Sequence, residues 1–437
     1  MRTNLIFFLF IIIISCSPKV NLELDIENLK KDGISILQSK NLKFDHSEVY
    51  KISQLATYPV IKNKNWTNPN FNSSTPIPNI ELDINFSISK TNNFFKDVKN
   101  NFYRKEILSI DKNTIFVDDQ STLFVINEDF KLLNRFKIHN LDKNKGYPLK
   151  FSLAWKNNIL FISDNLGSIL AYDLNFFKII WRNDLEVPFL SNLALSEKSI
   201  FVSNSNGKVY SFDILTGKQN WSFETGTQTA KSHKAYRMSV VNNKLLFSND
   251  FGKITCIDLA KEVLLWSHTL QLATAYHDIN LLELADFVVE NNNLYITSSF
   301  GSFLKLDLNS GKILWSNDIF STKTPPLINK NTAALVSNDG FLNVLDKTTG
   351  KLLYKKNLLK LLRIENIETK NIIPNNIFLL SDKLYITTNN GYFFWADSKN
   401  LEAVKYKKIS NTISSNISIS KQNIFFVGND DTIFKIQ

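Results

Sequence analysis

Apolar and polar residues alternate in short runs along most of the chain, and one such pattern recurs. Its clearest copy is Asn206–Trp221, which reads Asn-Gly-Lys-Val-Tyr-Ser-Phe-Asp-Ile-Leu-Thr-Gly-Lys-Gln-Asn-Trp. The initial Asn-Gly pair suits the positive φ angles of a tight hairpin turn, and Val209–Phe212 is rich in strand-forming residues. Asp213 can accept hydrogen bonds from a following turn that Gly217 closes in the left-handed region. The pattern therefore predicts a turn, a strand, a second turn and a further strand that begins near the tryptophan.

The pattern returns with fixed internal offsets. In six copies a glycine lies six residues before an aspartate: Gly167 and Asp173, Gly207 and Asp213, Gly252 and Asp258, Gly301 and Asp307, Gly340 and Asp346, Gly391 and Asp397. Eight residues after the aspartate come Trp181, Trp221, Trp266, Trp315, Tyr354 and Lys405, the last with Tyr406 beside it. Two degenerate copies flank these six, at Ser121 to Asn127 and at Asp430 to Gln437. Successive aspartate positions are 39 to 51 residues apart, about the length of one four-stranded propeller blade. Eight copies predict an all-β fold, an eight-bladed β-propeller with four-stranded antiparallel blades.

The last copy ends on its third strand, Ile433–Gln437, so the ring needs one more strand from elsewhere. Residues Ile80–Ile88 alternate between apolar and polar and precede the first blade, as expected of a half-buried strand. We expect this N-terminal strand to pair into the last blade and to close the ring, because closure protects sheet edges that invite aggregation. The propeller is predicted to occupy residues 66–437.

The N-terminus has the pattern of an export signal. Arg2 precedes an apolar run over Leu5–Ile14, which is too short to span a bilayer, and Ser15-Cys16 follows. The context of Cys16 resembles a bacterial lipobox, so we predict a lipoprotein signal peptide at 1–15, acylation of Cys16 and a lipid-anchored tether at 16–65. The alternative is an ordinary signal peptide with an incidental cysteine. Because Ser17 and not an aspartate follows, resemblance to lipoprotein sorting in Gram-negative bacteria implies the periplasmic face of the outer membrane.

Charge and cysteine content change this picture little. The formal net charge is +10, and +9 without residues 1–15, but the lysines are spread along the chain among many asparagines. This favours a compositional bias over a nucleic-acid surface. Cys256, the second of two cysteines, lies in a predicted strand and is expected to be a small core residue without a disulfide partner.

The sequence has none of the common catalytic motifs. It contains no phosphate-binding glycine loop, no Gly-x-Ser-x-Gly, no His-Glu-x-x-His and no Cys-x-x-Cys, and its five histidines lack metal-ligand spacing. His268 is expected to be a surface or packing residue, and the pairs Asp118-Asp119 and Asp430-Asp431 occupy hairpin turns of the repeat. The repeated aspartates and tryptophans are interpreted as structural, with the indoles packing between blades. We therefore expect no catalytic residue, no metal and no cofactor.

The repeat frame, as in Asp213–Trp221 and Asp307–Trp315, resembles the tryptophan-docking repeat of quinoprotein-type (PQQ-like) propellers over about residues 100–437. Two classes within that superfamily compete. Quinoprotein dehydrogenases hold PQQ and calcium, many with a vicinal disulfide and some with a haem, and a PQQ-dependent oxidoreductase is the alternative function. This chain has no adjacent cysteine pair and no Cys-x-x-Cys-His, and it is shorter than those enzymes usually are.

The BamB family of the outer-membrane β-barrel assembly machinery is more similar. The features shared with this family are the lipobox, an N-terminal tail that leads to a lone tryptophan followed by Pro and Asn (Trp66, Pro69), and eight blades. The chain also ends on the third strand of the last blade. The resemblance implies a non-catalytic scaffold that binds the POTRA domains of the barrel-inserting subunit BamA and assists outer-membrane protein folding and insertion. Longer connections are expected at 225–235, 270–283 and 358–373, where binding function tends to lie. By position, the family's contact residues resemble Tyr236, Arg237, Glu283 and Asp286. A propeller that recognises another envelope protein or a glycan is a further alternative.

Overall fold

The computed structural model describes residues 54–69, 71, 76–91, 104–140, 149–224, 237–248, 253–269, 284–298, 301–317, 321–322, 324–428 and 431–437. Side chains are not described at 269 and 284–286. Contacts divide the chain into two compact units, residues 1–49 and 50–437, and all described residues belong to the second.

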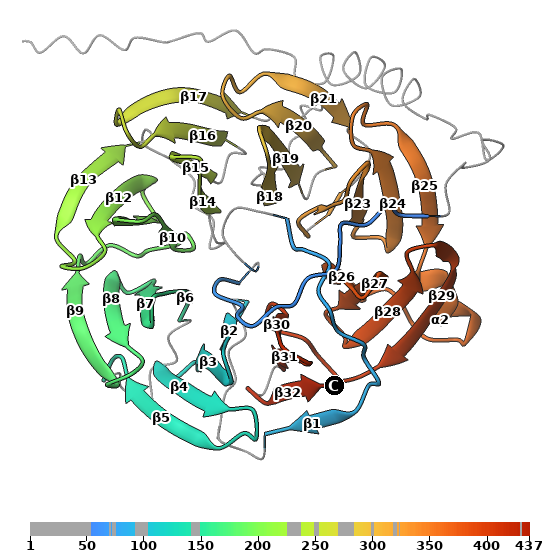
Figure 1. Ribbon diagram of the computed structural model, residues 1–437, viewed down its shortest axis with the longest axis horizontal. Coiled ribbons are helices and arrows are strands. Elements are labelled where there is room, and N and C mark those ends of the chain that lie inside the picture. The colour runs from blue at the N-terminus through green and yellow to red at the C-terminus, as the bar shows by residue number, and fades with distance from the viewer. Residues whose placement is uncertain are drawn as a thin grey trace, which may run out of the picture. The chain divides into compact units, whose positions relative to one another are not determined.

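The described residues form eight four-stranded antiparallel sheets that follow one another around a ring, each with its first strand innermost (Figure 1). Blade one consists of β2 (Ile107–Ile110), β3 (Asn113–Val117), β4 (Thr122–Asn127) and β5 (Leu132–Lys137), and blade two of β6 (Phe151–Lys156), β7 (Ile159–Asp164), β8 (Ser168–Asp173) and β9 (Lys178–Asp184). Blade three consists of β10 (Ala194–Leu195), β11 (Ser199–Ser203), β12 (Lys208–Asp213) and β13 (Gln219–Glu224), and blade four of β14 (Met238–Val241), β15 (Lys244–Ser248), β16 (Lys253–Asp258) and β17 (Val263–Thr269). Blade five consists of β18 (Leu284–Glu290), β19 (Asn293–Ser298), β20 (Phe303–Asp307) and β21 (Ile313–Asn317). Blade six consists of β22 (Leu327–Ile328), β23 (Thr332–Val336), β24 (Phe341–Asp346) and β25 (Leu352–Asn357). Blade seven consists of β26 (Pro374–Leu380), β27 (Lys383–Thr388), β28 (Tyr392–Asp397) and β29 (Asn400–Lys408). The eight-bladed propeller expected from the repeat is confirmed.

An N-terminal strand completes blade eight, as predicted. The last sheet has the order β1-β32-β31-β30, with β30 (Ser418–Ser420), β31 (Asn423–Val427), β32 (Ile433–Ile436) and β1 (Ile88–Lys90). Strand β1 is antiparallel to β32, with Ile88 opposite Ile436 and Lys90 opposite Phe434. Closure of the ring therefore joins the N-terminal part of the unit to the C-terminal strand.

The closing strand begins later than the predicted Ile80–Ile88. Phe86 has a φ of 58°, which interrupts the extended backbone, and the N–H groups of Asn85 and Ser87 both donate to the Gln437 carbonyl. The predicted alternation is nevertheless present, because Ile80 and Leu82 are buried against blades seven and eight while Glu81 and Asp83 are exposed. The pattern correctly predicted a half-buried segment but placed the strand several residues too early.

The aspartate turns have the predicted geometry and receive the aromatic residue of the preceding blade. The carboxylate of Asp213 accepts hydrogen bonds from the Leu215 and Thr216 N–H groups, at 3.1 and 2.8 Å. The Trp181 indole N–H of blade two donates to the Ile214 carbonyl at 3.3 Å. The same link joins later blades through Trp266 to Leu308 (3.0 Å), Trp315 to Lys347 (3.2 Å) and the Tyr354 hydroxyl to Leu401 (3.0 Å). Each of these aromatic residues thus fastens its blade to the next one.

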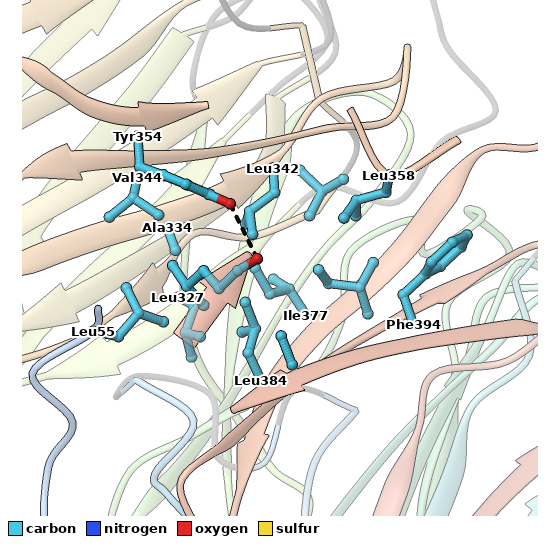
Figure 2. Close-up of a cluster of buried hydrophobic side chains, with 14 of the residues drawn as sticks. Leu55, Leu327, Ala334, Leu342, Val344, Tyr354, Leu358, Ile377, Leu384 and Phe394 are labelled. Carbon is cyan, nitrogen blue, oxygen red and sulfur yellow. Dashed lines mark hydrogen bonds between the residues drawn. The ribbon is translucent and has the colours of Figure 1, made fainter. Parts of the chain in front are cut away.

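The hydrophobic core of the described residues lies between the sheets. Eight clusters of buried side chains each bridge two successive blades around the ring. Figure 2 shows the cluster between blades six and seven, where Leu342 and Val344 face Ile377, Leu384 and Phe394. The short helix α2 (Leu359–Ile364) lies in the connection between these blades and adds two buried leucines to the cluster. Since each blade buries one face against each neighbour, no blade has a core of its own.

Two minor predictions concern packing residues. Cys256 is fully buried, and burial raises the pKa of its thiol to about 12, as expected for an inert core residue. His268 packs edge-on against Trp266. In the described part of the chain, no helix has the length and apolar character needed to cross a membrane.

Candidate functional site

The strand order gives the ring two chemically different faces. Because the strands in every blade are antiparallel and consecutive, the first-to-second and third-to-fourth turns lie together on one face. The second-to-third turns and the connections between blades lie on the other. We call these the N-terminal face and the loop face. Of the connections predicted to be long, 358–373 joins blades six and seven on the loop face, whereas 225–235 and 270–283 lie outside the described residues.

The N-terminal segment, residues 54–87, covers the N-terminal face and enters the channel. Figure 1 shows it in blue, crossing the middle of the ring before it reaches β1. The Trp66 N–H donates to the Ser109 carbonyl at 2.6 Å, and the Ser109 N–H donates back to Trp66 at 3.2 Å. The Trp155 N–H donates to Thr67 at 2.9 Å, and the Ser381 N–H donates to Ile80 at 2.9 Å. The segment thereby pairs with the channel edges of β2 and β6 and with the end of β26.

Apolar packing holds the same segment in the channel. Trp66 is only 1% exposed, and its ring meets Phe71 edge-on at 5.3 Å between centroids. Trp66 and Ile80 belong to the same cluster as Ile417 and Ile419 at the innermost edge of blade eight. Truncation of a fully buried tryptophan to alanine typically lowers the free energy of unfolding by about 3–5 kcal/mol.

Partly buried polar contacts fix the segment to blades five, six and seven. Asp382 accepts hydrogen bonds from the Thr57 hydroxyl at 2.6 Å and from the Asn79 amide at 2.7 Å. Glu290 accepts from the Tyr58 hydroxyl and, at 2.8 Å, from the Lys347 ammonium. Residues 54–65, which the sequence placed in the tether, therefore pack into the propeller, and the compact unit begins at Tyr50 rather than at residue 66.

At the loop face, side chains at the starts of the innermost strands link successive blades. We call the residues that form these links rim residues: Asn416 of blade eight, Glu106 of blade one, Ser152 of blade two, Asn192 of blade three and Arg237 of blade four. Each of the first four accepts a hydrogen bond from a backbone N–H of the next blade: Ile107 to Asn416 (3.0 Å), Leu153 to Glu106 (2.6 Å), Leu193 to Ser152 (3.1 Å) and Met238 to Asn192 (2.7 Å). The fifth, Arg237, places its guanidinium carbon 5.9 Å from the Phe287 ring centroid in blade five.

Glu106 is the electrostatic centre of these rim residues. Burial raises the pKa of its carboxyl to about 7, against the opposing effects of the Leu153 N–H, Lys150, Ser152 and Arg237. Burial likewise lowers the pKa of the Lys150 ammonium to about 8, although Glu106 raises it. The Lys150 ammonium also donates to the Leu190 carbonyl. The pair is thus a buried structural link between blades one, two and three.

A second buried charge cluster joins blades one and eight. The Lys105 ammonium lies 3.1 Å from Asp119 and also pairs with Asp431. Asp118 accepts hydrogen bonds from the Gln120 and Thr122 N–H groups, at 3.0 and 2.7 Å, as expected of a turn aspartate. The paired aspartates at these turns therefore have two structural roles, one in the turn and one in an interblade ion pair that the sequence interpretation missed.

The structure places only part of the predicted partner site. Arg237 lies directly before β14, and Asp286 lies in β18, one residue before Phe287. Arg237 contacts Phe287, the residue that follows Asp286 in the chain. Arg237 and Asp286 therefore belong to adjacent blades and lie at the same end of the channel. Tyr236, Glu283 and the predicted lipidation site Cys16 lie outside the described residues.

No metal centre is formed by the residues that the structure describes, since they contain no group of three or more His, Cys, Asp and Glu side chains with ligand geometry. Both ring nitrogens of His139 are engaged, Nε2 with Asp164 at 2.6 Å and Nδ1 with Arg182 at 3.2 Å. The Glu106 carboxylate and the Lys150 ammonium are likewise engaged, with the Leu153 N–H and the Leu190 carbonyl. The arrangement is suited to holding a rigid ring.

An eight-bladed ring whose aromatic residues dock on the aspartate turn of the next blade defines a quinoprotein-type propeller. Residues 139–356, about half of the chain, match the family model described as outer membrane protein assembly factor BamB. The chain belongs to the PQQ-like β-propeller family. No curated protein matches the chain by sequence.

Solved structures with the same fold are similar over most of their length. BamB from Moraxella catarrhalis superposes with a TM-score of 0.62 at 12% identity, covering 80% of this chain and 100% of that one. A europium-containing methanol dehydrogenase gives 0.61 at 11% identity, with 84% and 88% covered. The computationally designed Ika8 protein gives 0.58 at 12% identity, with 76% and 96% covered. At these identities the superpositions establish the fold alone.

Proposed function

We propose that this protein is a non-catalytic scaffold lipoprotein of an outer-membrane β-barrel assembly machinery. It binds a BamA-like barrel protein through that protein's POTRA domains and assists the folding and insertion of outer-membrane proteins. Acylated Cys16 anchors it on the periplasmic face of the outer membrane. The family model that matches residues 139–356 carries the description of an assembly factor, which supports this role over others open to the fold.

One observation carries the scaffold interpretation: the N-terminal segment occupies one end of the channel. Along blades one, two, seven and eight, the innermost strands contact the N-terminal segment through Trp66, Thr67, Ile80 and Asn63. A ligand at this end of the channel would have to displace a buried tryptophan and several backbone hydrogen bonds. Binding by the outer surface of a rigid ring needs no such displacement.

The loop face is the better candidate for partner binding. It carries Arg237 and the connection 358–373 with helix α2, whereas the described residues of the N-terminal segment cover the middle of the N-terminal face. Arg237 is half-buried and rigidly placed by its contact with blade five. A pre-organised arginine on a rigid rim loses little conformational entropy on binding, which is typical of residues that dominate interfaces.

A PQQ-dependent oxidoreductase is the competing function, since a methanol dehydrogenase shares the fold. That enzyme class needs cofactor-binding side chains that converge in the channel. Here the rim residues of blades eight, one, two and three already accept hydrogen bonds from the next blade, which supports a structural role for them.

The proposal is tested by recovering partners of the native lipidated protein from detergent-solubilised membranes. We expect enrichment of a β-barrel protein that carries POTRA domains. Because the C-terminal Gln437 bonds to Ser87 and Asn423, the affinity tag is joined through a long flexible linker so that ring closure is kept. Recovery of no such barrel protein, together with tight binding of PQQ by the purified chain, would overturn the scaffold role in favour of the oxidoreductase.

A further inference from the structure

Large apolar side chains are exposed along one arc of the ring. They lie in the third-to-fourth turns and at the starts of the outermost strands of blades one to five, at the edge of the N-terminal face. We call this set the apolar arc: Leu132, Leu133, Phe176, Phe177, Ile179, Ile180, Leu215, Val263, Leu264, Leu265, Ile313 and Leu314. Most of the exposed large hydrophobic side chains of the described residues belong to it, and such a concentration of exposed apolar side chains marks a candidate interaction site.

The repeat by itself does not require this exposure. At corresponding positions in blade six, Leu352 and Leu353 are half-buried. In blade seven, the exposed residues of the outermost strand near its start are Asn400, Glu402 and Ala403. In blade eight, Ile88 at the start of the outermost strand β1 is 41% exposed. The exposed apolar side chains are therefore concentrated in blades one to five and do not follow a packing rule shared by all blades.

The most exposed members of the arc lie at the tips of adjacent turns. Phe176 in blade two is 72% exposed and Leu215 in blade three is 70% exposed. Both follow an aspartate that holds the turn by accepting backbone N–H bonds, Asp173 and Asp213. The two side chains thus project from rigid turns, and apolar tips on rigid turns suit shallow insertion into the boundary between headgroups and acyl chains.

The route of the chain links this edge to the membrane. The Leu55 N–H donates to the Ser398 carbonyl in the third-to-fourth turn of blade seven, so the chain that leads back to Cys16 joins the ring at the N-terminal face. Residues 16–53 would reach up to about 125 Å if fully extended. The tether therefore allows contact with a bilayer, and by holding the ring near the surface it raises the effective concentration for a weak second contact.

The charges around the arc are balanced. Lys131, Lys178 and Lys312 each directly precede an apolar pair of the arc, but an acidic residue lies in each of the same turns. The lysine stems can lie along the apolar surface with their ammonium groups at the headgroup level. Contact through such a surface is mainly apolar and should depend little on ionic strength.

We propose that the apolar arc of blades one to five is a lipid-contacting surface that rests on the bilayer to which the chain is tethered. This rests on the membrane anchorage in the proposed function, and not on the identity of the protein partner. Contact at this edge holds the N-terminal face toward the bilayer and leaves the loop face, with Arg237, open toward the periplasm. A lipid anchor and a weak apolar contact together give stable, oriented attachment where either signal alone is marginal.

The test measures the environment of two labelled positions on vesicles of phosphatidylethanolamine and phosphatidylglycerol. The chain from residue 17 onward is attached by an N-terminal His tag to nickel-chelating lipids, so that the result does not depend on acylation of Cys16. An environment-sensitive fluorophore is placed at L215C in the arc or at L166C, a 37% exposed leucine in the second-to-third turn of blade two on the loop face. Cys256 is fully buried and is not expected to be labelled.

We expect a blue shift and quenching by bromine-labelled acyl chains at position 215 and neither change at position 166. Phe176→Ser in the L215C chain should reduce the blue shift, and increased salt should not abolish it. Absence of quenching at 215, or equal quenching at both positions, would overturn the proposal. A shift at 215 that grows with protein density but is not quenched by the lipids would instead identify a second copy of the chain as the occupant.

Discussion

The guanidinium carbon of Arg237 lies 5.9 Å from the centroid of the Phe287 ring, so the residue that enters blade four contacts blade five. Arg237 is also close enough to Glu106 in blade one to lower the pKa of that buried carboxyl against the dominant effect of burial. The candidate contact residue therefore belongs to the structural rim as well as to the loop face. Experiments on it must separate loss of binding from loss of folding.

Arg237→Glu is expected to weaken capture of the POTRA-bearing partner by about tenfold or more, as loss of an arginine anchor of about 2 kcal/mol would. Arg237→Lys keeps the charge and should retain most of the folding stability, but it loses the planar contact with Phe287. Arg135→Glu is the matched control, because Arg135 is exposed on the outermost strand of blade one. Partner recovery is compared at equal thermal stability of the variants. Full recovery by folded Arg237→Glu protein would remove Arg237 from the interface and leave the scaffold role open.

Removal of the N-terminal segment and β1 is expected to abolish cooperative folding. A chain that begins at residue 92 exposes the inner edges of β2 and β6 and the outer edge of β32, and it loses Trp66 and Ile80 from the core. A chain that begins at residue 50 keeps the whole compact unit and should melt as the mature protein does. The two are compared by calorimetry.

A finer version replaces Trp66 with alanine, which should cost about 3–5 kcal/mol of unfolding free energy. Stable, cooperative folding of the chain from residue 92 would show that blade eight closes without β1. It would contradict the closure described above.

The repeat allowed the architecture to be predicted because its markers are local. The Gly-to-Asp offset spans one strand and the Asp-to-Trp offset spans one turn, so both can be detected in a single stretch such as Gly207–Trp221. The destination of each tryptophan is also regular, since Trp181 reaches the turn of the next copy at Ile214. Periodicity therefore predicted the blades, their number and the role of the aromatic residues.

The remaining features depend on contacts between distant segments that carry no repeat. Residues 54–65 were interpreted as tether because many of their partners are distant in the sequence, such as Asp382, which is 325 positions from Thr57. Four of the rim residues were missed, and Arg237 was predicted only as a contact residue, because Asn, Glu, Ser and Arg occupy equivalent places. Only the fold shows that all five link successive blades. Alignment of the blades by their first strands, instead of their aspartate turns, would have revealed Glu106 and Arg237 as equivalent positions.

Gly217 and Trp181 are expected to be energetically coupled. A Cβ added to Gly217 would lie 2.5 Å from Cδ2 of the Trp181 indole, and Gly217 has a φ of 72°. Gly217→Ala should therefore destabilise the protein by roughly 2–4 kcal/mol, from overpacking and backbone strain together. In a Trp181→Ala background the clash disappears, and only the strain, about 1 kcal/mol, should remain. Equal costs in the two backgrounds, measured by denaturant unfolding, would show that the indole does not dock on this turn.

Glu106→Gln is expected to change how stability depends on pH. Burial raises the pKa of Glu106 from 4.5 to about 7 in the folded protein, so the folded state binds a proton that the unfolded state releases between these values. The contribution of Glu106 to stability is therefore fully present below about pH 4.5 and is lost as the pH rises through about 7. Glutamine keeps an acceptor for the Leu153 N–H but does not titrate. The wild-type protein should thus lose stability relative to the variant across this window.

Glu402→Gln provides a control of opposite sign. The Lys356 ammonium, which lies 3.0 Å away, lowers the pKa of Glu402, so its smaller contribution is present above the ordinary pKa and is lost as the pH falls. Denaturant unfolding at several pH values measures both differences. A constant difference between wild type and Glu106→Gln from pH 4.5 to 7 would show that Glu106 is not buried at the blade junction.

Binding of the envelope partner by the loop face can be measured by photo-cross-linking in intact cells, with a benzophenone side chain at Leu166 or Ile364 on the loop face, or at Leu215 on the N-terminal face. These leucine and isoleucine side chains are all exposed, so reactivity is not limited by burial. We expect cross-links to a POTRA-bearing barrel protein from the loop face and none to that protein from position 215. Cross-links to the barrel protein from position 215 alone would show that the partner binds the other face.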